Sequence, residues 1–588
     1  MTTGVNNATA ALKAAMPGID TSDERTDRLA WLSAVAGCLL IFGLLENPYW
    51  VPGGDSELYV SIARNLATGE GYLFNGQPVR ICPPGWPLIL AAVMKIWPSF
   101  LVMKLITLGC MTGALAVSYR IVRRYAPPKL SVVVILLTAL LSHVYSLTFW
   151  LHSDALFCLI SASAVLLSLQ FSEGRRSTAR AASIVLLGVC GVMVRFAGML
   201  NIVLICAALL DGARPWRAGR SLLLCLAVAG AVTAAFFTTR IAMKRFATPR
   251  VAYEDSLVVP DATAMISDAA AGDTAFESKD VSLLSGGIGA TGTGRRILGY
   301  GTWFSYLLWQ PFRLAPGWPA LFYVATFFGW IVFAVLAACA LVELRASRWL
   351  LPAALLYTII LCLRWPHATA RYLVPVAPII MLMIFLGTDA LRNAARKPWQ
   401  RRTVSGVAGV GVACIILCNA SLWAVEVSVM RSDRFYDRYE AGLNKNLMAI
   451  GAYLRAHDVG NWQVAVNPSY KNLDKHRWSP TGLRILTMIT GKATLSLPQD
   501  YKDKKLPKDR EFREWLKKNQ IEYYLEQPPV SPWRVWHFRA GWLQGYKTGK
   551  PVIDQGAGWK LYRCHGRGVP TPLDVTEYQV PLTRVPGF

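Results

Sequence analysis

The chain has 588 residues, of which 54% are hydrophobic and 16% charged, with a formal net charge of +25 and a mean hydropathy of +0.35. A soluble protein carries nearer a quarter charged residues, so this composition excludes an ordinary soluble globular protein. The basic excess does not indicate nucleic-acid binding, because much of it lies in short loops between apolar runs, where Lys and Arg set topology. The sequence therefore predicts a polytopic membrane protein.

Apolar runs of about 17 to 25 residues, long enough to cross a bilayer as helices, recur along the chain. They predict about eleven transmembrane helices, near residues 29–45, 100–119, 130–150, 153–171, 181–197, 199–210, 221–238, 319–342, 349–364, 372–388 and 403–425. A further run, Trp86–Trp97, is short and follows a proline corner. Reading it as an interfacial helix places the basic loops on one side, as the positive-inside rule requires. This topology predicts a cytoplasmic N-terminus and an extracytoplasmic C-terminus.

The same topology divides the chain into three parts. Residues 1–28 are expected to form a mostly disordered cytoplasmic tail, because they lack the pattern of a signal peptide. Residues 29–426 form the predicted transmembrane domain, with outer loops at 46–99 and 239–318. Residues 427–588, about 160 in number, are long enough for an extracytoplasmic domain of their own. Alternating helix-like and strand-like stretches favour an α/β fold for that domain.

Common catalytic and metal motifs do not account for this sequence. Most of the twelve cysteines lie within apolar runs, which argues against a disulfide framework or a zinc site. Cys82 and Cys564 fall in outer segments, and a bridge between them is an open possibility. The stretch Gly286–Gly292 spells G-x-G-x-x-G, but no strand precedes it, so a dinucleotide site is not predicted.

Two acidic residues, Asp55 and Glu57, follow the first apolar run directly. Carboxylates beside a membrane are costly unless they are used. In an extended turn, side chains two positions apart share a face, so these two could hold one divalent metal ion, or one could orient the other. The functional interpretation is a general base at the boundary between water and bilayer. The alternative is a pair of solvated loop acids.

Further polar residues lie at the predicted outer ends of other spans. Asp154 follows His152 by two residues, and either a catalytic role or capping of a helix explains it. Arg195 lies within apolar sequence, and Arg371 lies at a membrane boundary beside His367 and Tyr372. A guanidinium can bind a phosphate through paired hydrogen bonds. The alternative is that these arginine side chains extend to the membrane surface and have no role in binding.

Several of these segments together resemble the membrane-embedded glycosyltransferases of the GT-C type, near the protein O-mannosyltransferase and lipid A aminoarabinose transferase group. The similar features, over roughly residues 29 to 425, are Asp55-Ser56-Glu57, the spaced residues Tyr59, Ala63 and Leu66, the Pro83-Pro84-Gly85 corner, the segment V-R-F-A-G around Arg195, and A-R-Y-L-V-P-V-A-P around Arg371. The resemblance implies a GT-C-like helical membrane domain beside the C-terminal α/β domain.

The resemblance also implies a function: inverting transfer of a sugar from a polyprenyl-phosphate donor to an acceptor at the outer membrane face. Asp55 would be the general base, with Glu57 and Asp154 as further catalytic acids. Arg195, Arg371, Tyr372 and His367 would contact the donor phosphate, and a divalent metal at Asp55 and Glu57 is left open. The expected partners are the lipid-linked donor, a lipid, glycan or protein acceptor, and membrane lipids.

Two rival functions use the same residues differently. A transporter or lipid flippase would use the acids for coupling, but transporters tend to show repeats and broken helices at the midplane. A membrane anchor for the C-terminal domain would leave the acids unexplained. A bacterial inner membrane is the expected location, and the endoplasmic reticulum is the alternative.

Overall fold

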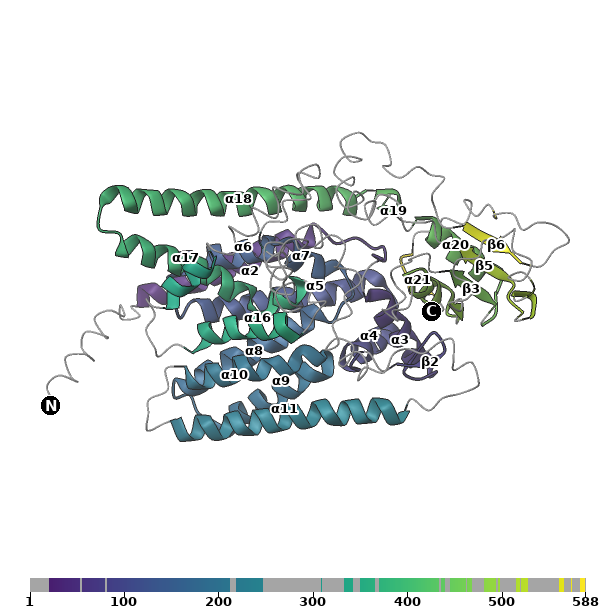
Figure 1. Cartoon of the computed structure of the whole chain (residues 1–588), viewed down its shortest axis with the longest axis horizontal. Helices are drawn as coiled ribbons and strands as arrows, with labels where there is room; N and C mark the ends of the chain where they lie inside the picture. Colours follow the sequence, from purple (N-terminus) through teal and green to yellow (C-terminus); the bar gives the residue numbers. More distant parts are fainter. Residues whose placement is uncertain are drawn as a thin grey trace, which may run out of the picture.

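The structure is a computed structural model in which helices dominate (Figure 1). It describes residues 21–52, 55–79, 82–211, 218–246, 308, 333–341, 349–364, 370–432, 435–438, 445–461, 463–467, 481–492, 495–496, 514, 516–518, 520–526, 560–564, 573 and 582–586. The predicted site residue His367 and the stretch Gly286–Gly292 lie outside these ranges. So do the predicted outer loop 239–318, apart from its first residues and Leu308, and most of the predicted span 319–342.

Long helices form a bundle in which strands are absent from the described residues. The helices of the bundle are α2 (Thr21–Gly43), α5 (Phe100–Val122), α6 (Pro128–Leu140), α7 (Ser142–Phe149), α8 (Asp154–Ser172), α9 (Thr178–Val194), α10 (Asn201–Leu210), α11 (Ala218–Phe246), α16 (Leu350–Arg364), α17 (Ala377–Ala394) and α18 (Pro398–Met430). Short 3-10 helices, η1 (Phe196–Leu200) and η4 (Ala370–Val376), precede α10 and α17. Helix α5 packs against α8, and α2 packs against α6.

Six of the described helices are long and apolar enough to cross a membrane, or seven if the bent pair α6 and α7 counts as one span. The protein is therefore a multi-pass membrane protein. Helices α9, α10 and α16 are shorter apolar helices. The prediction of about eleven spans is thus covered in part, and the full number stays a prediction.

Two sequence predictions of local structure are refined by the structure. The span predicted at 130–150 is a pair of helices that meet at a bend of 63°. Of the tail predicted at 1–28, the described residues from Thr21 onward are helical and belong to α2, and residues 1–20 lie outside the described ranges. Asp27 in this part accepts hydrogen bonds from Tyr119 of α5 and from Arg123, which follows α5.

A smaller layer of two helices lies between the bundle and the C-terminal residues (Figure 1). Helices α3 (Ser56–Thr68) and α4 (Gly85–Ile96) flank a two-stranded antiparallel sheet, β1 (Leu73–Phe74) and β2 (Gln77–Pro78). Helix α3 ends at Gly69, whose φ of 85° is a left-handed conformation that glycine adopts without strain. Helix α4, at the run predicted as interfacial, is too short to cross a bilayer.

The described C-terminal residues form a small mixed sheet with three helices. The strands are β3 (Val464–Asn467), β4 (Leu495–Ser496), β5 (Tyr523–Glu526) and β6 (Lys560–Arg563), in the order β4-β3-β5-β6, and β6 alone is antiparallel to its neighbour. The helices are α19 (Phe435–Arg438), α20 (Lys445–Ala456) and α21 (Thr481–Thr490). Helix α18 runs to Met430, past the predicted domain boundary at 427, and the division into domains stays a prediction. Cys82 and Cys564 are not joined by a disulfide in this structure.

Candidate active site

Five of the predicted site residues gather at one end of the bundle, although they come from distant parts of the sequence. Asp55 directly precedes α3, Asp154 opens α8, and Arg195 follows the last residue of α9. Arg371 and Tyr372 belong to η4, which leads into α17. Each side chain is thus held where a helix begins or ends. Loops and helix ends positioned by rigid elements commonly hold catalytic groups.

Two acid–arginine ion pairs form the centre of this cluster. Asp55 Oδ2 lies 2.9 Å from Arg371 Nη2, and Asp154 Oδ2 pairs with Arg195 Nη1. The first pair is partly accessible, with side-chain exposures of 20% for Asp55 and 19% for Arg371. The second is buried, at 4% for Asp154 and 8% for Arg195. A substrate can therefore reach Asp55 more easily than Asp154.

His152 connects the two acidic residues. The backbone N–H of Asp55 donates to His152 Nε2 at 3.1 Å, and His152 Nδ1 lies 3.9 Å from Asp154 Oδ2. The ring of Trp150 lies against the imidazole, with centroids 5.3 Å apart. Because Nε2 accepts a hydrogen bond, the neutral imidazole carries its proton on Nδ1, toward Asp154.

The ring of Tyr372 links the two arginines. The guanidinium of Arg195 lies 4.6 Å from the ring centroid, and that of Arg371 lies 5.4 Å from it. Each contact is a cation–π interaction, which is favourable in surroundings of low polarity. The aromatic ring therefore holds two positive groups near one another that would otherwise repel.

Tyr59, on the first turn of α3, is a further member of the cluster. Its hydroxyl is 3.0 Å from Ser153 Oγ, which ties α3 to the start of α8. Burial, together with the neighbouring Cys82 and Asp55, raises the pKa of the Tyr59 phenol, so the hydroxyl stays neutral. Ser153 occupies the N-cap position of α8 without a side-chain capping bond. Asp154 is the first residue of α8, so it does not occupy the N-cap position itself.

The structure does not contain the extended turn on which the possible pairing of Asp55 with Glu57 was based. Asp55 directly precedes α3, and Glu57 lies in its first turn, where residues two positions apart do not face each other. Glu57 is 1% exposed, so it is not a solvated loop acid either. A negative charge near a helix N-terminus is stabilised by the helix dipole, which accounts for its place.

The donor set does not fit a metal ion in the part of the chain that the structure describes. No three His, Cys, Asp or Glu side chains come together there as metal ligands. Asp55 and Asp154 each face a guanidinium, whose positive charge opposes a cation at the same oxygens. The extended turn that would have let Asp55 and Glu57 hold one metal ion is a helix start in the structure.

His152 and Tyr59 are the members of the cluster to which sequence reasoning gave no role. The His-x-Asp spacing of His152 and Asp154 was the available signal, since it places both residues on one short loop. Tyr59 was noted only as part of a motif. The arginine partners of the two acids were identified, but as contacts of a phosphate rather than of the acids.

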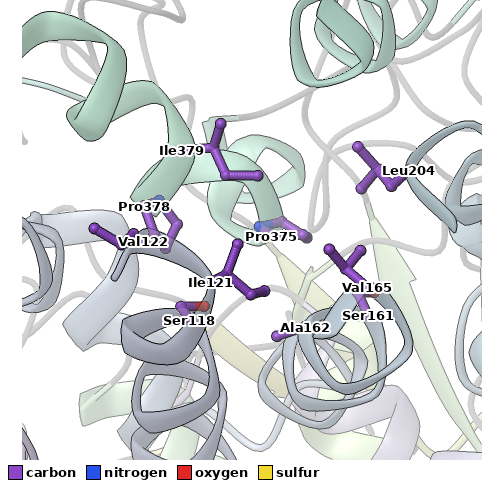
Figure 2. A pocket seen from close by; sticks show the side chains of 10 residues that line it. All are labelled: Ser118, Ile121, Val122, Ser161, Ala162, Val165, Leu204, Pro375, Pro378 and Ile379. Atoms are coloured by element: carbon purple, nitrogen blue, oxygen red, sulfur yellow. The ribbon is translucent and has the colours of Figure 1, made fainter. Parts of the chain in front are cut away.

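A narrow pocket lies between helices of the bundle (Figure 2). It is lined by apolar side chains of α5, α8, α10 and the start of α17, with the hydroxyl groups of Ser118 and Ser161 among them. Ser161 follows Asp154 by seven positions, about 10 Å along α8. The pocket contains no charged group, so it is not part of the charged site.

Comparisons with known proteins define the fold. No family model matches the sequence, and no curated protein matches it. The structure is similar to that of the oligosaccharyltransferase of Archaeoglobus fulgidus, in complex with Zn and sulfate, with a TM-score of 0.51 and 10% identity. That match covers 94% of this chain and 76% of the other.

Two structures of ArnT from Cupriavidus metallidurans are also similar to this chain. The form bound to undecaprenyl phosphate has a TM-score of 0.45 and 10% identity, and the apo form has 0.46 and 12%. Each match covers 84% of this chain and 92% of ArnT. These scores are too low to add to the argument. The likeness to the oligosaccharyltransferase confirms that the chain has the fold of a GT-C type membrane glycosyltransferase.

Proposed function

We propose that this protein is an inverting glycosyltransferase that moves a sugar from a polyprenyl-phosphate donor to an acceptor at the outer membrane face. The observation that carries the proposal is the cluster in which an accessible acid, Asp55, lies beside an arginine, Arg371, at the end of a GT-C type bundle. A base and a cation in contact are what the reaction requires, because a proton is removed and phosphate charge develops in the same step.

In the proposed step, the Asp55 carboxylate takes the proton of the acceptor hydroxyl. The hydroxyl oxygen attacks the anomeric carbon from the side opposite the phosphate, and the bond between that carbon and the phosphate oxygen breaks. The electron pair of that bond leaves with polyprenyl phosphate, and the configuration of the sugar is inverted. A positioned base contributes roughly 10²–10⁴-fold to such a rate.

Arg371 has two roles in this proposal. It pairs with Asp55 while no donor is bound, and the two opposite charges compensate each other beside the membrane. A donor phosphate competes for the same guanidinium, because arginine binds phosphate through paired hydrogen bonds. Binding of the donor then releases Asp55 from its partner and makes it a stronger base.

Arg195 and Asp154 take supporting roles. Their ion pair is buried, and His152 and Tyr372 connect it to the first pair. We infer that Asp154 holds Arg195 in place, and that Arg195 adds positive charge near the leaving phosphate. Glu57 has no proposed chemical step. The chemistry proposed here uses side chains of the chain alone, since the described donor set does not fit a metal.

The test compares the wild type with Asp55→Asn. Purified protein receives a panel of labelled polyprenyl-phosphate sugars and a membrane extract as the source of acceptors, and the release of polyprenyl phosphate is followed. We expect release by the wild type and at least a hundredfold loss in Asp55→Asn, because the amide cannot accept the proton. The matched control is Asp389→Asn, which removes an exposed carboxylate of α17 outside the cluster.

Each outcome of this experiment decides something. Equal release by the wild type and Asp55→Asn, with both folded, would remove Asp55 as the base. No release by the wild type with any donor, even after addition of a divalent metal, would favour the transporter or flippase. Loss of release in Asp389→Asn as well would mean that the assay reports folding rather than chemistry.

A further inference from the structure

The helix that begins after the proposed base has its other end buried in the C-terminal residues. One apolar core contains Leu58 and Ile62 of α3 together with Leu447 of α20 and Ile489 of α21. Figure 1 places α3 and α4 between the bundle and the C-terminal sheet. Because core contacts of this kind resist displacement, the position of α3 depends on both of its neighbours.

Arg64 makes the most specific contact in this interface. It lies on α3, and it is 6% exposed. Its Nη1 donates to the carbonyl of Met488 at 2.8 Å, and its Nη2 donates to the carbonyl of Thr487 at 3.1 Å. Both carbonyls belong to the last turn of α21, where carbonyl groups have no partner within the helix. A cation at a helix C-terminus is also favoured by the helix dipole.

The residues around Arg64 leave space for its guanidinium group and allow it to stay charged. Gly491, which follows α21, has a φ of 75°, and a Cβ built there would lie 3.4 Å from Arg64 Cζ and Nη1. Burial lowers the pKa of Arg64 to about 10, with Glu70 opposing the shift, so the group stays charged at neutral pH. Thr487 Oγ1 donates to Asn75 Oδ1 at 3.1 Å, which adds a second polar link between the two parts.

The segment on the other side of Asp55 is held by the C-terminal part as well. The N–H of Trp50 donates to the carbonyl of Leu582 at 2.8 Å, and the hydroxyl of Tyr436 donates to the carbonyl of Trp50 at 2.9 Å. Asp55 therefore lies between two segments that each contact residues of the C-terminal part, from Tyr436 onward.

We propose that the C-terminal part of the chain is a structural component of the active site, and that Arg64 is a positioning residue that holds α3, and with it Asp55, in register with Arg371. The catalytic side of this inference rests on the proposed function. Asp55 lies nine positions from Arg64, about 14 Å along the helix axis. A rigid helix transmits a shift at one end to the other, and a misplacement of about 1 Å can cost roughly 10²-fold in rate.

The test uses full-length protein and two independent measurements. Arg64→Met removes both hydrogen bonds to α21 while keeping an apolar stem, and Arg64→Lys keeps a charge without the paired geometry. Lys517→Met is the control, because Lys517 is an exposed basic residue of the C-terminal part. Hydrogen exchange is measured for peptides covering 55–68 and 154–172, and polyprenyl-phosphate release gives kcat and KM.

In Arg64→Met we expect the amides of 55–68 to exchange at least tenfold faster, with those of 154–172 unchanged. We expect kcat per folded molecule to fall 10- to 100-fold, with the donor KM changed less than threefold. Arg64→Lys is expected to lie between Arg64→Met and the wild type in both measurements. Lys517→Met is expected to match the wild type.

Unchanged exchange of 55–68 in Arg64→Met would overturn the inference, and so would faster exchange without loss of kcat. A purely structural role would reduce the amount of folded protein without changing kcat per folded molecule, which would also contradict it. If the wild type transfers no sugar, the proposed function fails, while the exchange measurement still decides whether Arg64 positions α3. If Arg64→Met does not fold, both measurements are made on Arg64→Lys instead and are judged by the same criteria.

Discussion

The two ion pairs of the candidate site differ in how much hydration each has lost through burial. Asp154 and Arg195 are both nearly inaccessible, so each has lost its water and depends on the other for compensation. Asp55 and Arg371 keep about a fifth of their surface exposed, and water can replace either partner. The accessible pair is therefore the one that can open during a reaction, and the buried pair is the one that holds geometry.

Glu46 and Lys104 form a second buried pair of opposite charges. Glu46 lies between the end of the first span and Asp55 in the chain. Lys104 Nζ is 4.0 Å from Glu46 Oε2 and donates to Asn47 Oδ1 at 2.7 Å. Burial raises the pKa of Glu46 to about 7, although the charge of Lys104, a hydrogen bond with the Thr148 side chain and the charge of Arg431 oppose the shift.

This raised pKa predicts how stability depends on pH. The folded protein holds the Glu46 proton more tightly than the unfolded chain, so the contribution is complete below the usual value of 4.5 and is lost as pH rises through about 7. In Glu46→Gln the group is neutral at every pH. We expect the wild type to lose on the order of 1–3 kcal/mol between pH 5 and 8 relative to Glu46→Gln. Thermal unfolding in detergent at several pH values measures this difference.

The control for this prediction is Glu24→Gln, because Glu24 is an exposed carboxylate on the first turn of α2. It should keep the pH dependence of the wild type. Parallel unfolding curves for the wild type and Glu46→Gln across this pH range would show that Glu46 is ionised in the folded state throughout.

At the scale of elements, close helix packing sets where Arg195 lies. Gly198, in η1, lies so close to α9 that a Cβ there would meet the carbonyl group of Gly191. Arg195 directly precedes η1 and pairs with Asp154 of α8. The small residue thus lets η1 fold back on α9 and direct the guanidinium toward its acid.

Gly198→Ala should therefore disturb both packing and the ion pair. We expect a loss of about 1–3 kcal/mol in unfolding free energy, because the backbone carbonyl cannot move aside easily. Sugar transfer per folded molecule should fall as well. Gly230→Ala is the matched control, since a Cβ on this α11 glycine meets nothing within 4 Å. Thermal unfolding and release of polyprenyl phosphate measure the two effects. Equal stability of both variants would contradict the packing argument.

The bend between α6 and α7 shows why the break within one predicted span could not be predicted. No Pro or Gly lies between Ser131 and Phe149, so the apolar run looks continuous. Leu141 is extended, with φ of −60° and ψ of 130°, and the N–H that follows it, on Ser142, donates to Asn419 Oδ1 at 3.0 Å. The break is stabilised by a side chain of α18, which local sequence does not contain.

At the scale of the whole molecule, charged groups mark the two ends of the bundle. One end carries the candidate site, and the opposite end carries Asp27 with Arg120 and Arg123, and Arg124 with Glu173. This separation is consistent with the predicted sidedness of the basic loops. The orientation in the membrane stays a prediction.

Cysteine labelling tests that orientation. Glu70 and Lys397 are exposed and lie at opposite ends of the bundle in the predicted topology. In a background with the exposed Cys414 replaced by Ser, we expect a membrane-impermeant maleimide added to intact cells to label Glu70→Cys. Lys397→Cys should react only after permeabilisation. The reverse pattern would invert the topology and would place the candidate site on the cytoplasmic side.

Local composition alone determined a large part of this description. The membrane class, six of the spans and the candidate residues Asp55, Asp154, Arg195 and Arg371 follow from apolar runs and from charges placed at their ends. These features depend on the transfer of short segments between water and lipid, which each segment decides for itself. The predicted domains and the roles of the site residues remain proposals.

Only the tertiary structure decided which charged side chains form contacts with each other. Asp55 and Arg371 are 316 residues apart, and Arg64 and Met488 are 424 apart. The sequence predicted both arginines of the cluster but paired them with a phosphate, and it paired Asp55 with Glu57. Contacts over such separations arise from how helices pack, and no periodicity or spacing within one segment contains that information.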